Sequence, residues 1–145
     1  MKPPKYIAEL KQVREVSLFG VAELAWWTKR LQCEGLFPTT SCGRAQGMIS
    51  GIASRFMGLP FRELVIAVFT TRTAGSDQRD GVFLLHAFNS SRLLAWSERT
   101  FFSTPYIHSQ LDVAIGPPAT LDLRLPELRL LSVKLVGDST EGRNS

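Results

Sequence analysis

The segment 61–72, Phe-Arg-Glu-Leu-Val-Ile-Ala-Val-Phe-Thr-Thr-Arg, constrains the fold of this chain more than any other feature. It has the length and the β-branched and aromatic content of a strand, and apolar residues occupy both alternating sets of its positions. A strand that is apolar on both faces is buried on both faces. We therefore expect this segment to lie in the centre of a sheet.

The rest of the chain alternates mainly with the period of strands, and two segments have helical spacing instead. Further strands are predicted at 13–22, 81–88, 106–113, 120–125 and 128–136, with a weaker one at 44–57, where Gly47 and Gly51 indicate a bulge or a close backbone approach. A turn is predicted at 58–60 and a polar hairpin loop at 73–80. Helices are predicted at 23–34, ending at Gly35, and after a cap at Asn89 or Ser90. The pattern predicts an α+β fold with two helices and a strongly curved, largely antiparallel sheet of about seven strands.

The length and the two ends of the chain indicate a simple domain organisation. A chain of 145 residues fits one domain, which we place at 13–137 after an N-terminal arm at 1–12. Residues 138–145 contain no core-forming side chain, so a disordered tail is expected there. The N-terminus lacks the apolar stretch of a signal peptide, and no apolar run reaches membrane-spanning length. A cytoplasmic protein without a membrane partner is therefore expected.

Charge and composition narrow the choice of ligand. The net charge is +4, and the Lys and Arg residues are spread along the chain, which argues against nucleic-acid binding and is compatible with an anionic small molecule. Two cysteines, Cys33 and Cys42, and two histidines, His86 and His108, are too few for a typical zinc site, so we expect reduced thiols and no metal. The segment 43–47 is too generic for a phosphate-binding loop, and no cofactor is predicted.

Two charged residues lie within apolar strand patterns. Arg14 shares a strand face with Val16 and Leu18, so it is either exposed at the strand end or buried with a partner. Glu63 shares a face with Phe61 and Val65, where desolvation would raise its pKa and suit it to general acid or base catalysis. A structural ion pair between Glu63 and an arginine is the alternative.

The segment 106–113 carries a polar stripe. Tyr106 and His108 are two residues apart on a predicted strand and therefore point the same way, and Gln110 and Asp112 continue the series. On an open sheet such a stripe is the solvent-facing side. On a sheet that closes into a barrel, it would instead line a ligand cavity.

Four motifs follow one another along the chain: Leu59-Pro-Phe-Arg-Glu-Leu64, Gly81-Val-Phe-Leu-Leu85, Ser91-Arg-Leu-Leu-Ala95 and Thr104-Pro-Tyr-Ile-His108. In this order they resemble the acetoacetate decarboxylase-like proteins, and most closely an uncharacterised bacterial branch of that superfamily. The resemblance covers most of residues 13–115. It implies a single domain whose β-structure closes into a cone around a cavity. The longer members continue beyond the point matching Val136, which implies that a cavity wall is missing here or is supplied by another subunit.

The resemblance also assigns roles to particular residues. The arginine, glutamate and Schiff-base lysine of the decarboxylases fall on Arg14, Glu63 and Tyr106. A phenol cannot form the imine that a primary amine forms, so Schiff-base decarboxylation is not expected. Arg14 would hold a carboxylate, Glu63 would act as acid or base, and Tyr106, with His108 beside it, would donate a hydrogen bond to a carbonyl oxygen.

Two functions follow from these assignments. The first is a domain that binds a carboxylate or carbonyl compound, with proton transfer as the reaction that its groups support; the sequence leaves open whether it is an enzyme. The alternative is a non-catalytic, homo-oligomeric interaction module. In that case the aromatic residues Trp26, Phe101 and Phe102 form the contact surface, and Arg14 and Glu63 form a structural ion pair. A homo-oligomer is expected in either case.

Overall fold

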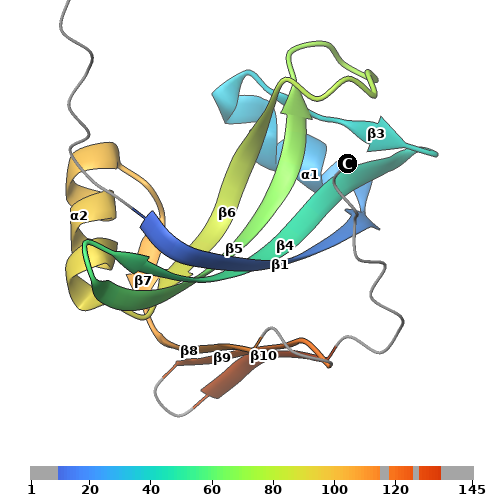
Figure 1. Ribbon diagram of the computed structural model, residues 1–145. Helices are drawn as coiled ribbons and strands as arrows, with labels where there is room; N and C mark the ends of the chain where they lie inside the picture. Colours follow the sequence, from blue (N-terminus) through green and yellow to red (C-terminus); the bar gives the residue numbers. More distant parts are fainter. Residues whose placement is uncertain (1–9, 115–117, 126–127, 135–145) are drawn as a thin grey trace, which may run out of the picture.

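The computed structural model describes residues 10–114, 118–125 and 128–134. The predicted tail at 138–145 and most of the predicted arm lie outside these residues, and the first strand begins at Leu10. The described chain forms two β-sheets and two α-helices, which confirms the α+β class (Figure 1). Neither helix in this part of the chain has the length and hydropathy to cross a lipid bilayer.

The larger sheet has seven strands: β1 (Leu10–Ala22), β2 (Phe37–Pro38), β3 (Thr40–Ser41), β4 (Arg44–Phe56), β5 (Leu59–Thr71), β6 (Gly81–Asn89) and β7 (Tyr106–His108). Its main order is β1-β4-β5-β6-β7, with β2 paired to β5 and β3 paired to β4. All of its pairs are antiparallel except β6 with β7. The strand at 61–72 is central, as predicted, because β5 has a long neighbour on each side.

The turn between β4 and β5 fixes which residues of the two strands lie side by side. Phe56 pairs with Leu59, so the loop consists of Met57 and Gly58 only, both with positive φ (48° and 86°). Positive φ at both central residues is the requirement of the type I′ turns that join twisted antiparallel strands. The predicted turn at 58–60 was thus displaced toward the C-terminus.

The smaller sheet contains β8 (Gln110–Ala114), β9 (Thr120–Leu125) and β10 (Leu128–Lys134) in the order β10-β9-β8. The predicted hairpin between the last two strands is confirmed by their antiparallel pairing. This sheet packs on the larger one through a shared apolar core of Val16, Leu64, Phe88, Leu111, Val113, Leu121 and Leu123. A Cβ atom on Gly51 would overlap Cδ2 of Leu121, so the close approach predicted for this glycine is present, whereas the β4 pairings contain no bulge at Gly47 or Gly51.

The two helices pack on opposite faces of the larger sheet. Helix α1 (Leu24–Leu31) continues into a short 3-10 helix (Gln32–Glu34) and ends at Gly35, as predicted, with φ of 65°. Trp27 of α1 packs with Val68 of β5, whereas Ala95 of α2 (Arg92–Phe102) packs with Val65. Since residues 65 and 68 of one strand project to opposite faces, so do the helices. The cap of α2 is Ser91, one residue after the predicted positions; its side chain accepts a hydrogen bond from the Leu94 amide.

The larger sheet does not close into the expected cone. Its end strands, β1 and β7, do not pair with each other anywhere in the described residues, and neither sheet curls strongly. The reason lies after β7, which has only three residues: the chain leaves the larger sheet at Ser109, and the following strands pair among themselves. They cover the apolar residues of the larger sheet as a second layer instead of extending it toward β1.

Candidate functional site

The two faces of the larger sheet carry different candidate residues. Paired residues of neighbouring strands project to the same face, and successive residues alternate. One cross-strand row contains Glu63, Asn89 and His108, and it lies on the face covered by α2, here called the α2 face. The adjacent row contains Arg14, Ala53 and Arg62 and lies on the opposite face, here called the cleft face. The predicted set of Arg14, Glu63 and Tyr106 is therefore divided between the two faces.

Glu63 and Tyr106 are brought together on the α2 face. The Glu63 carboxylate lies within hydrogen-bonding reach of the Tyr106 phenol and the Asn89 amide. Burial is the largest influence on Glu63 and raises its pKa, as predicted, and the nearby Glu98 raises it further, against the two hydrogen-bond donors. Burial also raises the pKa of Tyr106, so its phenol keeps the proton and acts as a donor to Glu63.

The neighbours of this pair complete a small polar cluster beneath α2. Asn89 is 1% exposed, and its Oδ1 accepts a hydrogen bond of 2.8 Å from the Ser91 amide at the start of α2. Glu98 of α2 is half-buried, and its carboxylate acts electrostatically on both Glu63 and Tyr106. The cluster of Glu63, Asn89, Glu98 and Tyr106 therefore links the sheet to α2. Within it the Tyr106 phenol keeps its proton and donates a hydrogen bond to the Glu63 carboxylate.

Replacing Glu63 with Gln is expected to change how stability depends on pH. Because the pKa of Glu63 is raised in the folded protein, the folded state binds more protons than the unfolded state once the pH exceeds the unfolded pKa of about 4.3. Stability then falls as the pH rises toward the folded pKa, with a slope of at most about 1.4 kcal/mol per pH unit. The Glu63→Gln variant has no carboxyl at this position, so its stability does not fall with pH for this reason.

Urea unfolding of both proteins at about pH 4.5 and about pH 7.5 measures this difference. The free energy of unfolding of Glu63→Gln, relative to wild type, should be larger at the higher pH, which means that the variant is relatively more stable there. An equal difference at both values would show that the Glu63 carboxyl does not titrate abnormally.

The prediction that the polar residues from Tyr106 to Asp112 form one surface is wrong. Tyr106 is buried against Val65 and Ala87, whereas His108 is exposed. From Ser109 onward the buried positions are the odd-numbered ones, so Gln110 and Asp112 lie on the exposed side of the smaller sheet. The change of sheet at Ser109 separates the two halves of the stripe.

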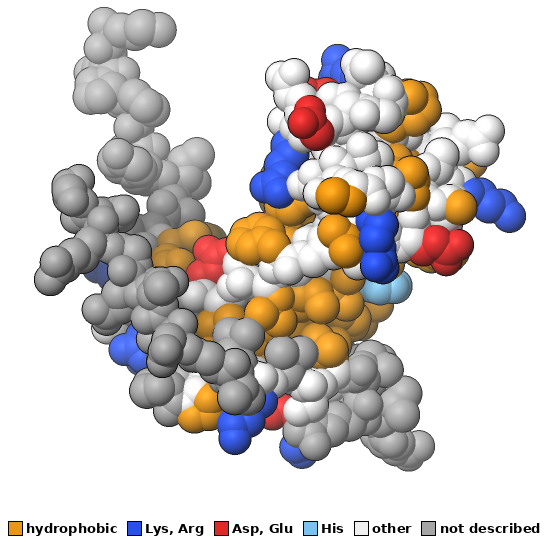
Figure 2. Space-filling view, turned by 90° about the vertical axis from the view of Figure 1, so that its right-hand side faces the viewer, with side chains coloured by type: hydrophobic (Ala, Val, Ile, Leu, Met, Phe, Trp, Pro, Cys, Tyr) orange, Lys and Arg blue, Asp and Glu red, His pale blue; other side chains and the backbone are white. Residues whose placement is uncertain are grey.

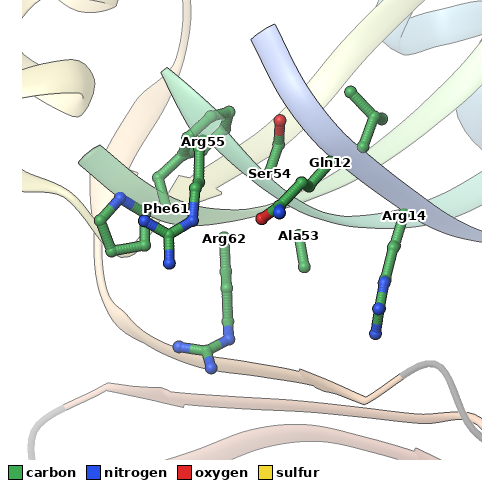
Figure 3. Close-up of a pocket in the computed structure, with 9 residues that line it drawn as sticks. Gln12, Arg14, Ala53, Ser54, Arg55, Phe61 and Arg62 are labelled. Atoms are coloured by element: carbon green, nitrogen blue, oxygen red, sulfur yellow. The ribbon is translucent and has the colours of Figure 1, made fainter. Parts of the chain in front are cut away.

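Arg14 lies in a cleft on the opposite side of the larger sheet. The cleft has a volume of about 540 Å³ and is lined by Gln12, Val13, Arg14, Ala53, Ser54, Arg55, Pro60, Phe61 and Arg62. Figure 3 shows Arg14 and Arg62 extending side by side toward the smaller sheet, with the short side chain of Ala53 between them. Arg55, two residues beyond Ala53 on β4, is the third guanidinium of the cleft.

The three arginines have few ionic partners. Arg62 Nε lies 3.7 Å from Oδ1 of Asp112, a long and largely exposed contact, and Arg55 donates to the Gly58 carbonyl at 3.3 Å. Among the described residues, no carboxylate lies within 4.0 Å of Arg14 or Arg55. None of the described residues that line the cleft is acidic. Exposed guanidinium groups without acidic partners bind carboxylate and phosphate groups well, because their planar N–H donors match two acceptor oxygens.

Arg55 and Arg62 were missed by the sequence analysis. They lie on the two arms of the β4–β5 hairpin, where Arg62 pairs with Ala53 and Arg55 with Pro60. Counting outward from a two-residue turn at Met57-Gly58 would have placed both arginines on one face. A turn placed at 58–60 obscures this pairing.

Other chemistry is not indicated in the described part of the chain. Cys33 and Cys42 are free and exposed, and no group of three or more potential metal ligands is found among the described residues. The described residues that line the cleft include no lysine. A search of protein-family models finds no match for this chain, and neither does a search of curated proteins.

The aromatic residues suggested as an oligomer surface are exposed, but they do not form one surface. Trp26 belongs to α1 and Phe101 and Phe102 belong to α2, and these helices lie on opposite faces of the larger sheet. Trp26 packs edge-on against Trp27.

Proposed function

We propose that this chain is a binding domain for an anionic small molecule, such as a carboxylate or an acidic carbonyl compound, held in the cleft between Arg14 and Arg62. The observation that carries the proposal is the concentration of three guanidinium groups in one cleft whose described lining residues include no acidic side chain. The net charge of +4 supports attraction of an anion to the protein as a whole.

The arrangement of the row suits a small anion. Arg14 and Arg62 flank Ala53 across two strand spacings, which separates their backbones by roughly 10 Å. Each side chain is long enough to turn its head group toward the middle, where the methyl group of Ala53 leaves room. A carboxylate there can accept paired N–H donors from one or both arginines.

The pair of Glu63 and Tyr106 has a separate role in this proposal, because it lies on the other face. The ordered motifs and the α+β fold support kinship with the acetoacetate decarboxylase-like proteins, with Tyr106 in place of the reactive lysine. Because position 106 is a tyrosine and no described lining residue of the cleft is a lysine, we propose binding without Schiff-base decarboxylation. Proton transfer by Glu63 and Tyr106 would require a ligand on the α2 face.

The proposal is tested by isothermal titration with succinate and with inorganic phosphate as probes, at low salt because exposed ionic contacts are screened. The variants Arg14→Gln and Arg62→Gln are each expected to weaken binding about 10-fold, as loss of one charged hydrogen-bonding group costs about 1.5 kcal/mol. Arg92→Gln, an exposed arginine of α2, is the matched control and should bind as wild type does.

Uncharged succinamide should bind neither the wild-type protein nor any of the variants. The proposal is rejected if neither anion binds the wild-type protein, or if Arg92→Gln weakens binding as much as the cleft variants. The second result would indicate general attraction to a cationic surface instead of a site.

A further inference from the structure

Strand β1 is an edge strand whose two halves differ in how well they are protected from pairing. The first half contains Lys11, Arg14 and Glu15, a positive φ of 53° at Gln12, and a shift of register between Lys11 and Arg14. Charges and bulges of this kind discourage the addition of another strand. The second half, residues 16–22 (Val-Ser-Leu-Phe-Gly-Val-Ala), carries no charge and pairs with β4 without interruption.

The outer edge of this second half is unpaired within the described residues. Phe19 and Val21 remain 66% and 48% exposed. A long, uncharged, regular edge with exposed apolar side chains is a template for strand addition, because its outward N–H and C=O groups have no protein partner.

An apolar hollow lies beside the same half of β1. It has a volume of about 260 Å³ and is lined by Leu18, Phe19, Gly20, Val21, Ala22, Trp27, Gly47, Met48, Ile49, Ile66 and Ala67. The hollow lies on the cleft face of the larger sheet. Trp27 of α1 is at one side of it, and the smaller sheet, which covers Gly51, is at the other. A Cβ atom on Gly20 would meet nothing within 4 Å, so the hollow is open at this glycine. Figure 2 shows hydrophobic side chains gathered across the middle of this side of the molecule.

We propose that a second copy of this chain pairs with residues 16–22 of β1 in antiparallel register about a two-fold axis at Phe19. In this register Leu18 of one copy lies opposite Gly20 of the other. Directly opposed residues share a face. Each leucine therefore extends over the open position at the partner's glycine and enters its hollow, and the symmetry makes this contact twice.

The same register explains the exposed aromatic ring. Phe19 of each copy lies opposite the other on the α2 face, where an aromatic cross-strand pair is favourable. Phe19 already stacks on Phe69 with ring centroids 6.1 Å apart, so its position is held before pairing. The two sheets become one continuous sheet.

A second copy fits this edge because the segment is complementary to itself. One stretch of seven residues supplies both the protruding Leu18 and the open Gly20, and none of the seven residues is charged. The arginine cleft lies at the other half of β1 and stays accessible. The interface is thus independent of the proposed anion site, and either can fail without the other.

Analytical ultracentrifugation of wild type and variants tests the interface. Gly20→Leu should fold, because its side chain enters open space, yet it occupies the hollow that the partner's Leu18 needs. We expect it to raise the dimer dissociation constant by about 100-fold or more, and Val21→Lys to do the same by placing charge at the edge. Val82→Lys is the matched control, since Val82 is 45% exposed on β6, and it should remain dimeric.

A disulfide experiment tests the register. In a Cys33→Ser, Cys42→Ser background, Phe19→Cys should oxidise to a covalent dimer, since opposed residues lie about 5 Å apart and disulfides bridge such distances. Val21→Cys should not, because the register sets it opposite Ser17 of the other copy. A wild-type protein that is monomeric up to high concentration overturns the proposal, as does a Gly20→Leu variant that stays dimeric. Equal cross-linking at both positions overturns the register.

Discussion

Gly51→Val is expected to lower the free energy of unfolding by about 3 kcal/mol, the upper part of the usual range for overpacking a core. A Cβ atom at this position overlaps Leu121, which is 1% exposed and held among the apolar residues between the two sheets. The added side chain must therefore displace β9 from the larger sheet or force Leu121 from its rotamer. Equilibrium urea unfolding measures the loss.

Gly20→Val is the matched control for this variant. Gly20 and Gly51 lie in paired strands on the same face, both without positive φ, but a Cβ atom at Gly20 meets nothing. At a concentration where the protein is monomeric, Gly20→Val should be as stable as wild type or slightly more so, because glycine is unfavourable in a strand. Equal destabilisation by the two variants would contradict the described packing of the smaller sheet.

Asn89→Leu is expected to destabilise the protein by a similar amount, about 3 kcal/mol. The substitution leaves the partly buried Ser91 amide without its acceptor and removes a donor from the Glu63 carboxylate, and a buried group left unpaired costs about 1–3 kcal/mol. Because the Ser91 amide begins α2, hydrogen exchange in α2 should also accelerate.

Asn89→Asp separates the two contributions. Its carboxylate can still accept from the Ser91 amide, but it cannot donate to Glu63 and adds a charge beside it. Its stability relative to wild type should therefore improve as the pH falls and one carboxyl becomes protonated. If Asn89→Leu unfolds at the same urea concentration as wild type, the cluster beneath α2 does not stabilise the fold.

The elements that were predicted correctly are those whose signal is local. The two-sided apolar pattern of 61–72 placed β5 in the centre, and helical spacing followed by Gly35 placed α1 and its end. The glycine at position 51 was expected at a close approach, although nothing in the sequence indicated that Leu121 would be the neighbour. Contacts between strands that are distant in the chain depend on packing that a local pattern does not contain.

Closure of the sheet could not be predicted from pattern alone. The alternation of 106–113 is the same whether the strand stays in one sheet or changes sheet at Ser109. Only the buried positions show the change, since Tyr106 faces α2 while Leu111 and Val113 face the core between the sheets.

The candidate site was predicted in part. Glu63 and Tyr106 meet, and the raised pKa of Glu63 was expected from its apolar neighbours. Arg14 was assigned to the same space, but the face on which it lies depends on the pairing of β1 with β4 across an intervening helix. This pairing is not encoded by the spacing of β1 itself.

The two-residue turn between β4 and β5 sets how many guanidinium groups lie in the cleft. Arg62 and Glu63 are neighbours on β5 that project to opposite faces, and only the length of the turn determines which of them stands beside Ala53. A shift of this pairing by one residue, carried along β5, would turn Glu63 to the cleft face and Arg62 to the α2 face. The cleft of a relative with the shifted register would keep Arg14 and Arg55 but exchange one guanidinium for a carboxylate, and we expect it to bind anions more weakly.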